Sequence, residues 1–248
     1  MNSRERYEDT FSIASYEADY AGTLSLYALM NRFQELAGQH AASLQVGYNT
    51  LKDAGLAWIL SRMKVQIRSL PCWGDTVHLA TWPKGIDRLY ALRDFCVTGG
   101  KGQTLVNATT AWLLIDTDKG RPRRIESLPI DLHFPNAQHA LQDLLEKIQM
   151  PKELMPVFEK SIWLSDLDTN RHVNNAQYVK WITDCFSEEQ FRDRRIASLQ
   201  VNYLEETLVG DTVRLFKSPS DISASEYFLE GRSCKNRTIV FHAHVVWE

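Results

Sequence analysis

The chain has 248 residues, of which 44% are apolar and 24% charged, and its formal net charge is −3. This apolar content is typical of a folded globular protein and excludes a disordered one. A slightly negative charge argues against a general nucleic-acid binder, which normally carries a basic excess. The charged N-terminus and the lack of an apolar run near the roughly 20 residues of a membrane span predict a cytoplasmic protein without a signal peptide or membrane anchor.

Cysteine and histidine spacing gives no sign of a metal or a disulfide framework. The four cysteines lie far apart without CxxC spacing, at Cys72, Cys96, Cys185 and Cys234. This pattern predicts reduced thiols. The pair His242 and His244 has ligand-like spacing, but no third ligand lies near it in the sequence. We therefore predict no metal and no cofactor.

The first half of the chain reads as one helix followed by long strands. Apolar residues recur at helical spacing at Leu26, Met30, Phe33 and Ala37. Polarity then alternates from Met63 to Arg68, which indicates a half-buried strand, and an apolar β-rich stretch covers residues 108–115.

Residues 126–157 differ in character from the segments on either side. Four prolines interrupt this stretch, at Pro129, Pro135, Pro151 and Pro156. Between them, a helical face is predicted from Ala140, Leu141, Leu144, Leu145 and Ile148. We interpret the segment as a linker that contains one helix, lies on the surface and takes no part in chemistry.

The second half repeats the pattern of the first. Residues 74–77, Gly-Asp-Thr-Val, recur at 210–213, a displacement of 210 − 74 = 136. The second copy also follows an alternating strand, at 199–204, and a helical pattern at Ala176, Val179, Ile182 and Phe186. An apolar stretch at 238–247 closes this half. We predict a duplicated α+β fold with domains at 1–125 and 158–248 and a linker at 126–157.

A polar segment just before the second helical pattern carries the best candidates for chemistry. Asp168, Asn170 and His172 stand at alternate positions, so in an extended segment their side chains would point the same way. Asn174 or Asn175 fits the N-cap of the helix, and the helix N-terminus offers donors for a developing oxyanion. A histidine can move protons near neutral pH. The alternatives are a structural histidine at the helix start and a purely structural Asp168.

These residues resemble a known family, the plant and bacterial acyl-acyl-carrier-protein thioesterases. Its motif Asp-x-Asn-x-His-Val-Asn-Asn-x-x-Tyr is matched from Asp168 to Tyr178 at every specified position. The resemblance implies two tandem hotdog domains, each a curved antiparallel sheet wrapped around a central helix. It also implies hydrolysis of fatty acyl thioesters on acyl carrier protein, which releases free fatty acid and ends chain elongation in fatty acid biosynthesis.

The resemblance implies a second catalytic carboxylate in the second half. In the family it lies on a strand in a Tyr-x-x-Glu-Cys context, which Glu206 matches, whereas Glu205 should face the other way. Thr207 stands where many relatives have cysteine, so general-base hydrolysis by water is favoured over a cysteine nucleophile. The expected catalytic set is Asp168, Asn170, His172 and Glu206.

The first half should lack these groups. Aligning Tyr27 with Tyr178, a displacement of 178 − 27 = 151, sets Glu17, Asp19 and Ala21 opposite Asp168, Asn170 and His172. At displacement 136, Leu70 corresponds to Glu206. One active site per chain, in the second half, is therefore expected.

The resemblance places the acyl chain in the first half. The expected lining is Met30, Phe33, Trp58 and Met63, and Asn174 and Asn175 are also expected to bind the substrate. An ordinary hydrophobic core is the alternative for each of the four apolar residues taken singly.

The expected partner is an acidic carrier protein that bears a phosphopantetheine-linked acyl chain. Two basic clusters are candidates for its docking surface: Lys119, Arg121, Arg123 and Arg124, and also Arg192, Arg194 and Arg195. An acyl-coenzyme A thioesterase and a non-catalytic acyl-binding hotdog protein are the rival hypotheses, and a hotdog dehydratase ranks last. Both a monomer and a homodimer are compatible with the tandem layout.

Overall fold

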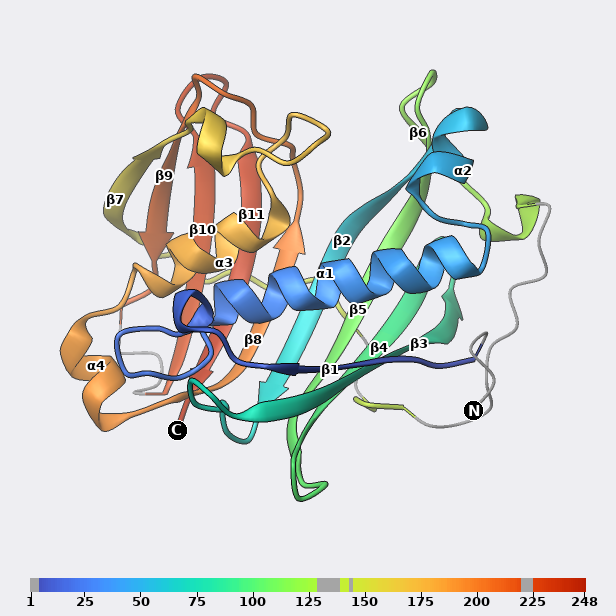
Figure 1. The fold of residues 1–248 in the computed structure, drawn as a ribbon. Helices are drawn as coiled ribbons and strands as arrows, with labels where there is room; N and C mark the ends of the chain where they lie inside the picture. Colours follow the sequence, from blue (N-terminus) through green and yellow to red (C-terminus); the bar gives the residue numbers. More distant parts are fainter. Residues whose placement is uncertain (1–4, 129–138, 143–144, 220–224) are drawn as a thin grey trace. The chain divides into compact units, whose positions relative to one another are not determined.

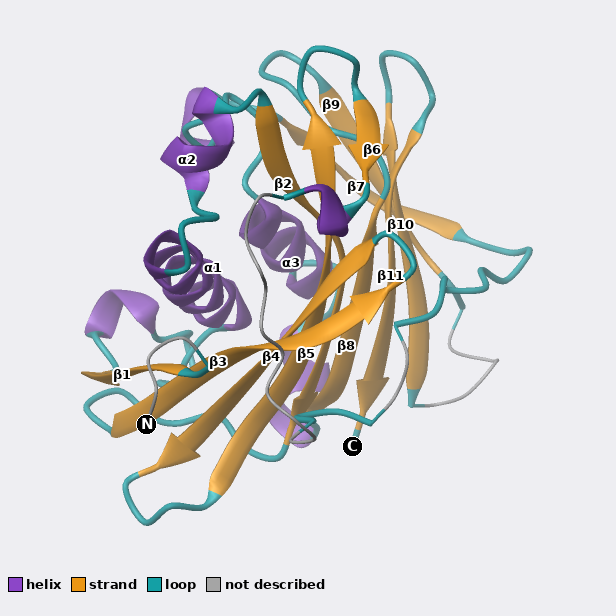
Figure 2. Ribbon diagram, turned by 90° about the vertical axis from the view of Figure 1, so that its right-hand side faces the viewer, coloured by secondary structure: helices purple, strands orange, loops and turns teal. Residues whose placement is uncertain are grey.

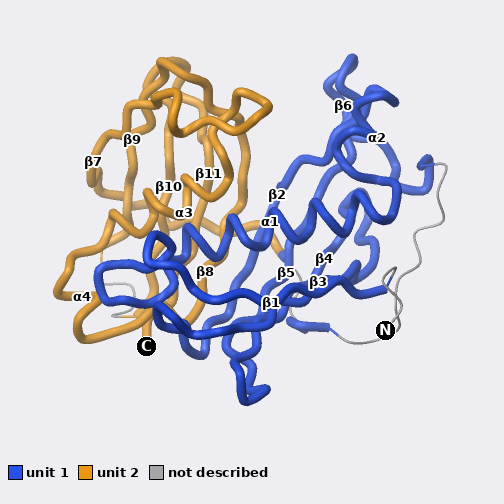
Figure 3. The backbone as a smooth tube through the Cα atoms, in the orientation of Figure 1, with its two compact units in different colours: residues 1–145 blue, residues 146–248 orange. Residues whose placement is uncertain are grey.

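The structure of the protein, a computed structural model, describes residues 5–128, 139–142, 145–219 and 225–248. The chain forms two compact units, residues 1–145 and residues 146–248 (Figure 3). Their boundary falls inside the segment expected to be a linker, while the predicted domain limits at 125 and 158 stay a prediction. Each unit combines an antiparallel sheet with a helix packed against it, which confirms the α+β class (Figure 1).

The first unit has six strands and two α-helices within its described residues. Its strands are β1 (Tyr7–Ser12), β2 (Leu56–Ile67), β3 (Thr76–Asp87), β4 (Tyr90–Gly99), β5 (Thr104–Asp116) and β6 (Arg121–Arg123). They pair antiparallel in the order β1-β3-β4-β5-β2, with β6 beside β5. The helices are α1 (Leu26–Ser43) and α2 (Tyr48–Asp53), and Figure 2 shows α1 on one face of the strands of its unit.

Helix α1 forms where the helical apolar spacing predicts it. The side chain of Ser25 accepts a hydrogen bond from the Ala28 N–H and so caps its first turn. Its apolar face packs on the sheet, where the rings of Phe33 and Phe95 stack with centroids 4.6 Å apart. Such a helix gains most of its stability from burying this face.

In the part of the second unit that the structure describes, five strands and a shorter central helix repeat the plan. Its strands are β7 (Met155–Ser161), β8 (Ile196–Tyr203), β9 (Thr212–Lys217), β10 (Glu226–Ser233) and β11 (Ile239–Trp247), in the order β8-β11-β10-β9-β7. The helices are α3 (Asn175–Thr183) and α4 (Glu188–Asp193). Helix α3 stops before Phe186, which the helical pattern had included. Phe186 is still buried, against Trp247 at a ring distance of 4.9 Å.

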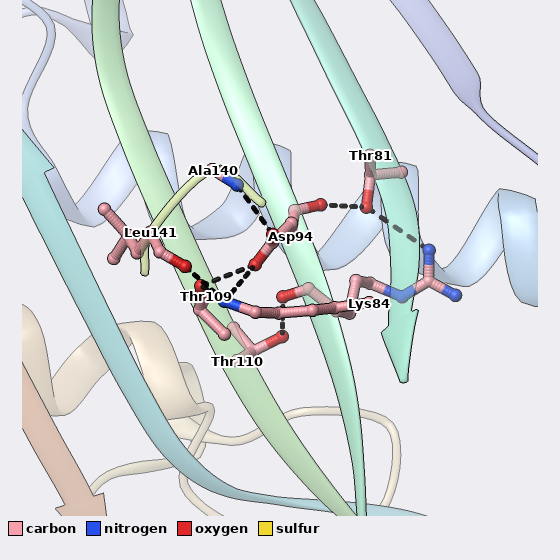
Figure 4. A network of polar contacts seen from close by, with 8 residues as sticks. Thr81, Lys84, Asp94, Thr109, Thr110, Ala140 and Leu141 are labelled. Atoms are coloured by element: carbon pink, nitrogen blue, oxygen red, sulfur yellow. Dashed lines mark hydrogen bonds and ion pairs between the residues drawn. The ribbon is translucent and has the colours of Figure 1, made fainter. Parts of the chain in front are cut away.

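The prediction of a helix in the linker is wrong for the linker residues that the structure describes. Residues 139–142 and 145–150 contain no helix, and residues 143–144 lie outside the described part of the chain. The backbone here hydrogen-bonds to side chains of the first sheet: the Ala140 N–H donates to Asp94 over 2.7 Å, and Lys84 donates to the Leu141 carbonyl (Figure 4). Leu141 and Leu145 are buried, so their apolar spacing reflects an extended segment that covers a sheet.

All four cysteines are free thiols. No helix within the described residues is long and apolar enough to cross a membrane.

Candidate active site

The polar motif folds as a tight turn and not as an extended segment. A β-bridge joins Leu167 to Val173, and the Asp168 N–H donates to the His172 carbonyl over 2.8 Å. Inside the turn, Oδ1 of Asp168 accepts from the N–H groups of Asn170 at 2.8 Å and His172 at 3.3 Å. The premise that alternate side chains converge is therefore wrong. An aspartate readily bonds to backbone N–H groups just ahead of it, and this local bonding closes the turn.

The three candidate side chains of the motif differ in burial and in hydrogen bonding. Asp168 organises the backbone, Asn170 is exposed at the tip of the turn, and His172 is half-buried at its end. Asn174 follows as the N-cap of α3, with its side chain accepting from the Ala176 N–H over 2.9 Å. Asn175 is the first helical residue, and its carbonyl accepts from the Tyr203 hydroxyl over 3.3 Å. No contact in the structure tests a role of Asn174 or Asn175 in substrate binding.

His172 and Glu206 are the two predicted site residues whose side chains meet. Nε2 of His172 lies 3.2 Å from Oε2 of Glu206. Their side chains are 36% and 53% exposed, so the pair is open to solvent and to a ligand. Glu206 does not lie on a strand as expected, because β8 ends at Tyr203. Both Glu205 and Glu206 are exposed in the following segment, and the contact with His172 distinguishes Glu206 from its neighbour.

Thr207, the residue that follows Glu206, holds the Glu206 segment in place. It is buried at 1% exposure, and its carbonyl accepts from the Val173 N–H over 3.0 Å. Its hydroxyl accepts from the Tyr178 hydroxyl over 3.0 Å, and burial raises the pKa of Tyr178 to about 12. Thr207 therefore ties the Glu206 segment to the motif and to α3. Its buried, bonded hydroxyl is poorly placed to act as a nucleophile, in agreement with attack by water.

Asp166 supports the same turn and was missed by the sequence analysis. It is buried, and its Oδ2 accepts from the Trp163 N–H at 2.8 Å and from Nζ of Lys160 at 3.0 Å. Its carbonyl accepts from the Asn174 N–H over 3.0 Å. A correct alignment of the two halves would have revealed it, because the first half has an acidic residue at the equivalent position.

The first unit contains the same turn without the histidine and glutamate of the second. Asp19 bonds to the N–H groups of Ala21 and Thr23, both at 3.0 Å, and its own N–H donates to the Thr23 carbonyl over 2.8 Å. The equivalence is therefore Asp19 to Asp168, a displacement of 168 − 19 = 149. The sequence-based displacement of 151 was wrong by two residues, since it aligned helical positions and not the turn.

The corrected alignment strengthens the case for a single site. Thr23 takes the place of His172, and Glu17 takes the place of Asp166. Ile13 and Ile162 both bond to the repeated Gly-Asp segment, to the carbonyls of Asp75 and Asp211 respectively, both at 2.9 Å. This confirms the displacement of 211 − 75 = 136 after the helix, at which Leu70 corresponds to Glu206. The first copy keeps the turn and lacks both the imidazole and the carboxylate.

The remaining candidates have ordinary structural surroundings. Met30, Phe33 and Met63 are buried in the core of the first unit. Trp58 is half-buried and donates its indole N–H to the Val46 carbonyl over 3.0 Å. That these four residues line an acyl pocket stays a prediction.

The histidines on β11 pair with carboxylates. His242 lies 2.8 Å from Glu230, and His244 lies 3.1 Å from Glu226. No group of three or more metal-binding side chains occurs among the residues that the structure describes.

Two units that each set a helix on a curved antiparallel sheet, with a His–Glu pair beside the helix start of the second, define a tandem hotdog protein. The solved structures agree. An acyl-ACP thioesterase from Bacteroides thetaiotaomicron superposes with a TM-score of 0.85 at 24% identity, covering 100% of both chains. The 12:0-ACP thioesterase from Umbellularia californica superposes with a TM-score of 0.84 at 25% identity, covering 98% of this chain and 97% of that one.

The chain belongs to the acyl-ACP thioesterase family. Residues 4–130 match the acyl-ACP thioesterase N-terminal domain and residues 157–244 match the C-terminal domain. A dodecanoyl-[acyl-carrier-protein] hydrolase of Cinnamomum camphora is 30% identical over 225 residues, which are 84% of this chain and 58% of the relative. An acyl-[acyl-carrier-protein] hydrolase of Cuphea viscosissima is 29% identical over 219 residues, 79% of this chain and 50% of the relative. The chain thus spans about half the length of such curated relatives.

Proposed function

We propose that this protein hydrolyses the thioester of fatty acyl-acyl carrier protein, releases the free fatty acid and so ends chain elongation in fatty acid biosynthesis. The observation that carries this proposal is the contact between His172 and Glu206 at the end of the family motif. The camphor and Cuphea relatives are named as hydrolases of this substrate class, which supports the same substrate for this chain.

The geometry supports attack by water. A water beside the His172–Glu206 pair gives its proton to the pair, and its oxygen forms a bond to the acyl carbon. The developing oxyanion is favoured by the partial positive charge at the N-terminus of α3, which begins three residues after His172. The bond between carbon and sulfur then breaks, and the thiolate of the carrier takes up the proton.

Release of free thiol tests the proposal directly. One acyl group is presented on acyl carrier protein and on coenzyme A, and the wild type is compared with His172→Ala and Glu206→Ala. The expected result is faster hydrolysis on the carrier and a loss of about 100-fold or more in both variants, the usual contribution of general acid–base catalysis. A preference for coenzyme A would overturn the carrier assignment, and binding without turnover would favour an acyl-binding protein.

The cytoplasmic location is part of the proposal. Its support is the set of four free cysteines, which suits a reducing compartment.

A further inference from the structure

The tip of the catalytic turn is held in a conformation that disfavours its residue. Arg171 has φ 65°, in the left-handed region, where a side chain costs free energy and glycine does not. The equivalent residue of the first unit, at displacement 149, is Gly22 with φ 77°. The same turn is therefore built twice, and the half with His172 carries an exposed arginine where glycine would be more stable. Strained residues cluster at functional sites, and Arg171 directly precedes His172.

A second strained arginine lies at the same end of this unit. Arg237, with φ 62°, is exposed in the hairpin between β10 and β11, next but one to Lys235. The segment that holds Glu206 runs between the two arginines. It bonds to the catalytic turn through Val173 and to the strand after the hairpin through the Val240 carbonyl, which accepts from the Glu205 N–H.

The three cations are free to meet a partner. Arg171, Lys235 and Arg237 are all exposed, and among the described residues none lies within ion-pair distance of a carboxylate. The nearby acidic groups are mostly engaged: Asp211 bonds to Ser233, and Glu206 contacts His172, whereas Glu205 is exposed.

In the two clusters expected from sequence, four of the seven cations are paired, whereas Arg121 and Arg124 are exposed. Lys119 and Arg123 both face Asp116, Arg192 pairs with Glu188, and Arg195 pairs with Glu248.

Exposed apolar side chains occur in segments that bond to the same turn, since the Leu167 N–H donates to the Leu164 carbonyl and the Val173 N–H donates to the Thr207 carbonyl. Trp163, Leu164, Leu208 and Val209 are 65%, 79%, 53% and 51% exposed. The two pairs are neighbours, because Ile162 bonds to both Asp211 and Gly210. An exposed apolar patch with cations beside it is typical of a surface that receives a protein.

We propose that this loop end of the second unit, formed by the apolar patch with Arg171, Lys235 and Arg237, is the surface on which the acidic acyl carrier protein docks. The proposal rests on the proposed function. Charge complementarity selects the occupant, since free cations on an otherwise negative protein attract an acidic partner and accelerate its association. Docking here delivers the thioester to His172, which follows Arg171 in the chain.

The test uses substitutions to glycine, which remove charge without disturbing the turns. Arg171→Gly, Arg237→Gly and the double variant are compared with Arg88→Gly. Arg88 is a matched control, because it is an exposed arginine with φ 56° in the turn between β3 and β4 of the other unit. The same acyl group is presented on carrier protein, on coenzyme A and on pantetheine, which has no charge.

For the carrier substrate at low salt, we expect kcat/KM of the double variant to fall about tenfold, mainly through KM, as steering effects of this kind do. The loss should shrink at high salt, and the pantetheine substrate should change by less than about twofold. Arg88→Gly should stay within about twofold on every substrate. Melting temperatures should be unchanged or raised in all variants, because glycine relieves the strain.

Other outcomes separate the possible failures. An equal loss on carrier and coenzyme A would show recognition of a phosphate common to both, and would overturn the carrier surface. No loss in the double variant would overturn it too. If the wild type fails to hydrolyse any carrier thioester, the proposed function falls. In that case docking is tested on its own, by measuring the affinity of fluorescently labelled holo-carrier protein for the wild type and for the double variant.

Discussion

Nε2 of His172 lies 3.2 Å from Oε2 of Glu206, and this contact joins a turn residue to a segment 34 positions further along the chain, 206 − 172. The pair can share a proton and take another from water. Replacing Glu206 with glutamine keeps the shape of the side chain and removes its basicity. We expect kcat to fall about 100-fold to 10,000-fold, as for the loss of a general base.

The adjacent carboxylate provides the control for this experiment. Glu205→Gln removes the same charge from the same exposed segment without touching His172. Its kcat should stay within about threefold of wild type, since a surface charge away from the reacting atoms has little effect on the chemical step. A comparable loss in both variants would show that the local charge, and not the contact with His172, matters.

The duplicated turn allows stability and catalysis to be separated at Asp168. Asp168→Ala and Asp19→Ala each remove a carboxylate that accepts two backbone N–H bonds. Each should lower the free energy of unfolding by about 1.5–3 kcal/mol, the usual value for hydrogen bonds to a charged group. Only Asp168→Ala should also reduce kcat, by tenfold or more, because it releases His172.

Urea unfolding and thiol release measure the two effects. Asp168→Asn should retain most of the stability, because an amide oxygen accepts the same bonds. If Asp19→Ala reduced kcat as strongly as Asp168→Ala, the turn of the first unit would have a catalytic role that the absence of an equivalent histidine does not suggest.

The sequence predicts the repeated plan well because hydrophobic periodicity reports which face of an element is buried. It fails where local hydrogen bonding decides the conformation. Its alternate polar spacing predicts an extended motif, yet the Asp168 carboxylate bends the chain into a turn. The apolar spacing around Leu141 indicated a helix, yet its carbonyl bonds to Lys84 of a neighbouring sheet. Such a contact joins residues 57 positions apart, which no local pattern encodes.

The buried carboxylate of Glu17 should make the folding stability of the protein sensitive to acid. Burial alone would raise its pKa, but hydrogen bonds from Arg32, at 2.7 Å, and from the Ala14 N–H hold it below the ordinary value of 4.5. A lowered pKa in the folded state contributes stability above the unfolded value, and this stability is lost as the pH falls through the folded value. Glu17→Gln should therefore cost about 1.5–3 kcal/mol at pH 7 and less at pH 3.

Chemical denaturation at both pH values measures this difference. Glu8→Gln is the control, since Glu8 is half exposed in its pair with Arg6 and should change stability by less than about 1 kcal/mol at either pH. If Glu17→Gln lowered the free energy of unfolding equally at pH 7 and pH 3, the ionised carboxylate would not be the source of the stability.

The last prediction concerns the buried network that fastens the linker to the first sheet (Figure 4). Nζ of Lys84 lies 3.5 Å from Asp94, whose side chain is fully buried and bonds to Thr109 and to the Ala140 N–H. Lys84→Met would leave Asp94 as a buried charge without its cation. We expect a loss of about 3–5 kcal/mol, the cost of breaking a buried ion pair from one side.

The pH dependence of this variant gives a second check on the same network. Burial raises the pKa of Asp94 above its ordinary value even with hydrogen bonds from Thr109 and Ala140 and the charge of Lys84 opposing it. Without Lys84 that pKa should rise further, so the variant gains stability as the pH falls and loses it as the pH rises through the folded value. Urea unfolding at pH 5 and pH 8 measures the trend. Lys119→Met, which removes an exposed cation 4.0 Å from Asp116, should cost less than about 1 kcal/mol at both values. A similarly small cost for Lys84→Met would mean that water, and not Lys84, balances the charge of Asp94.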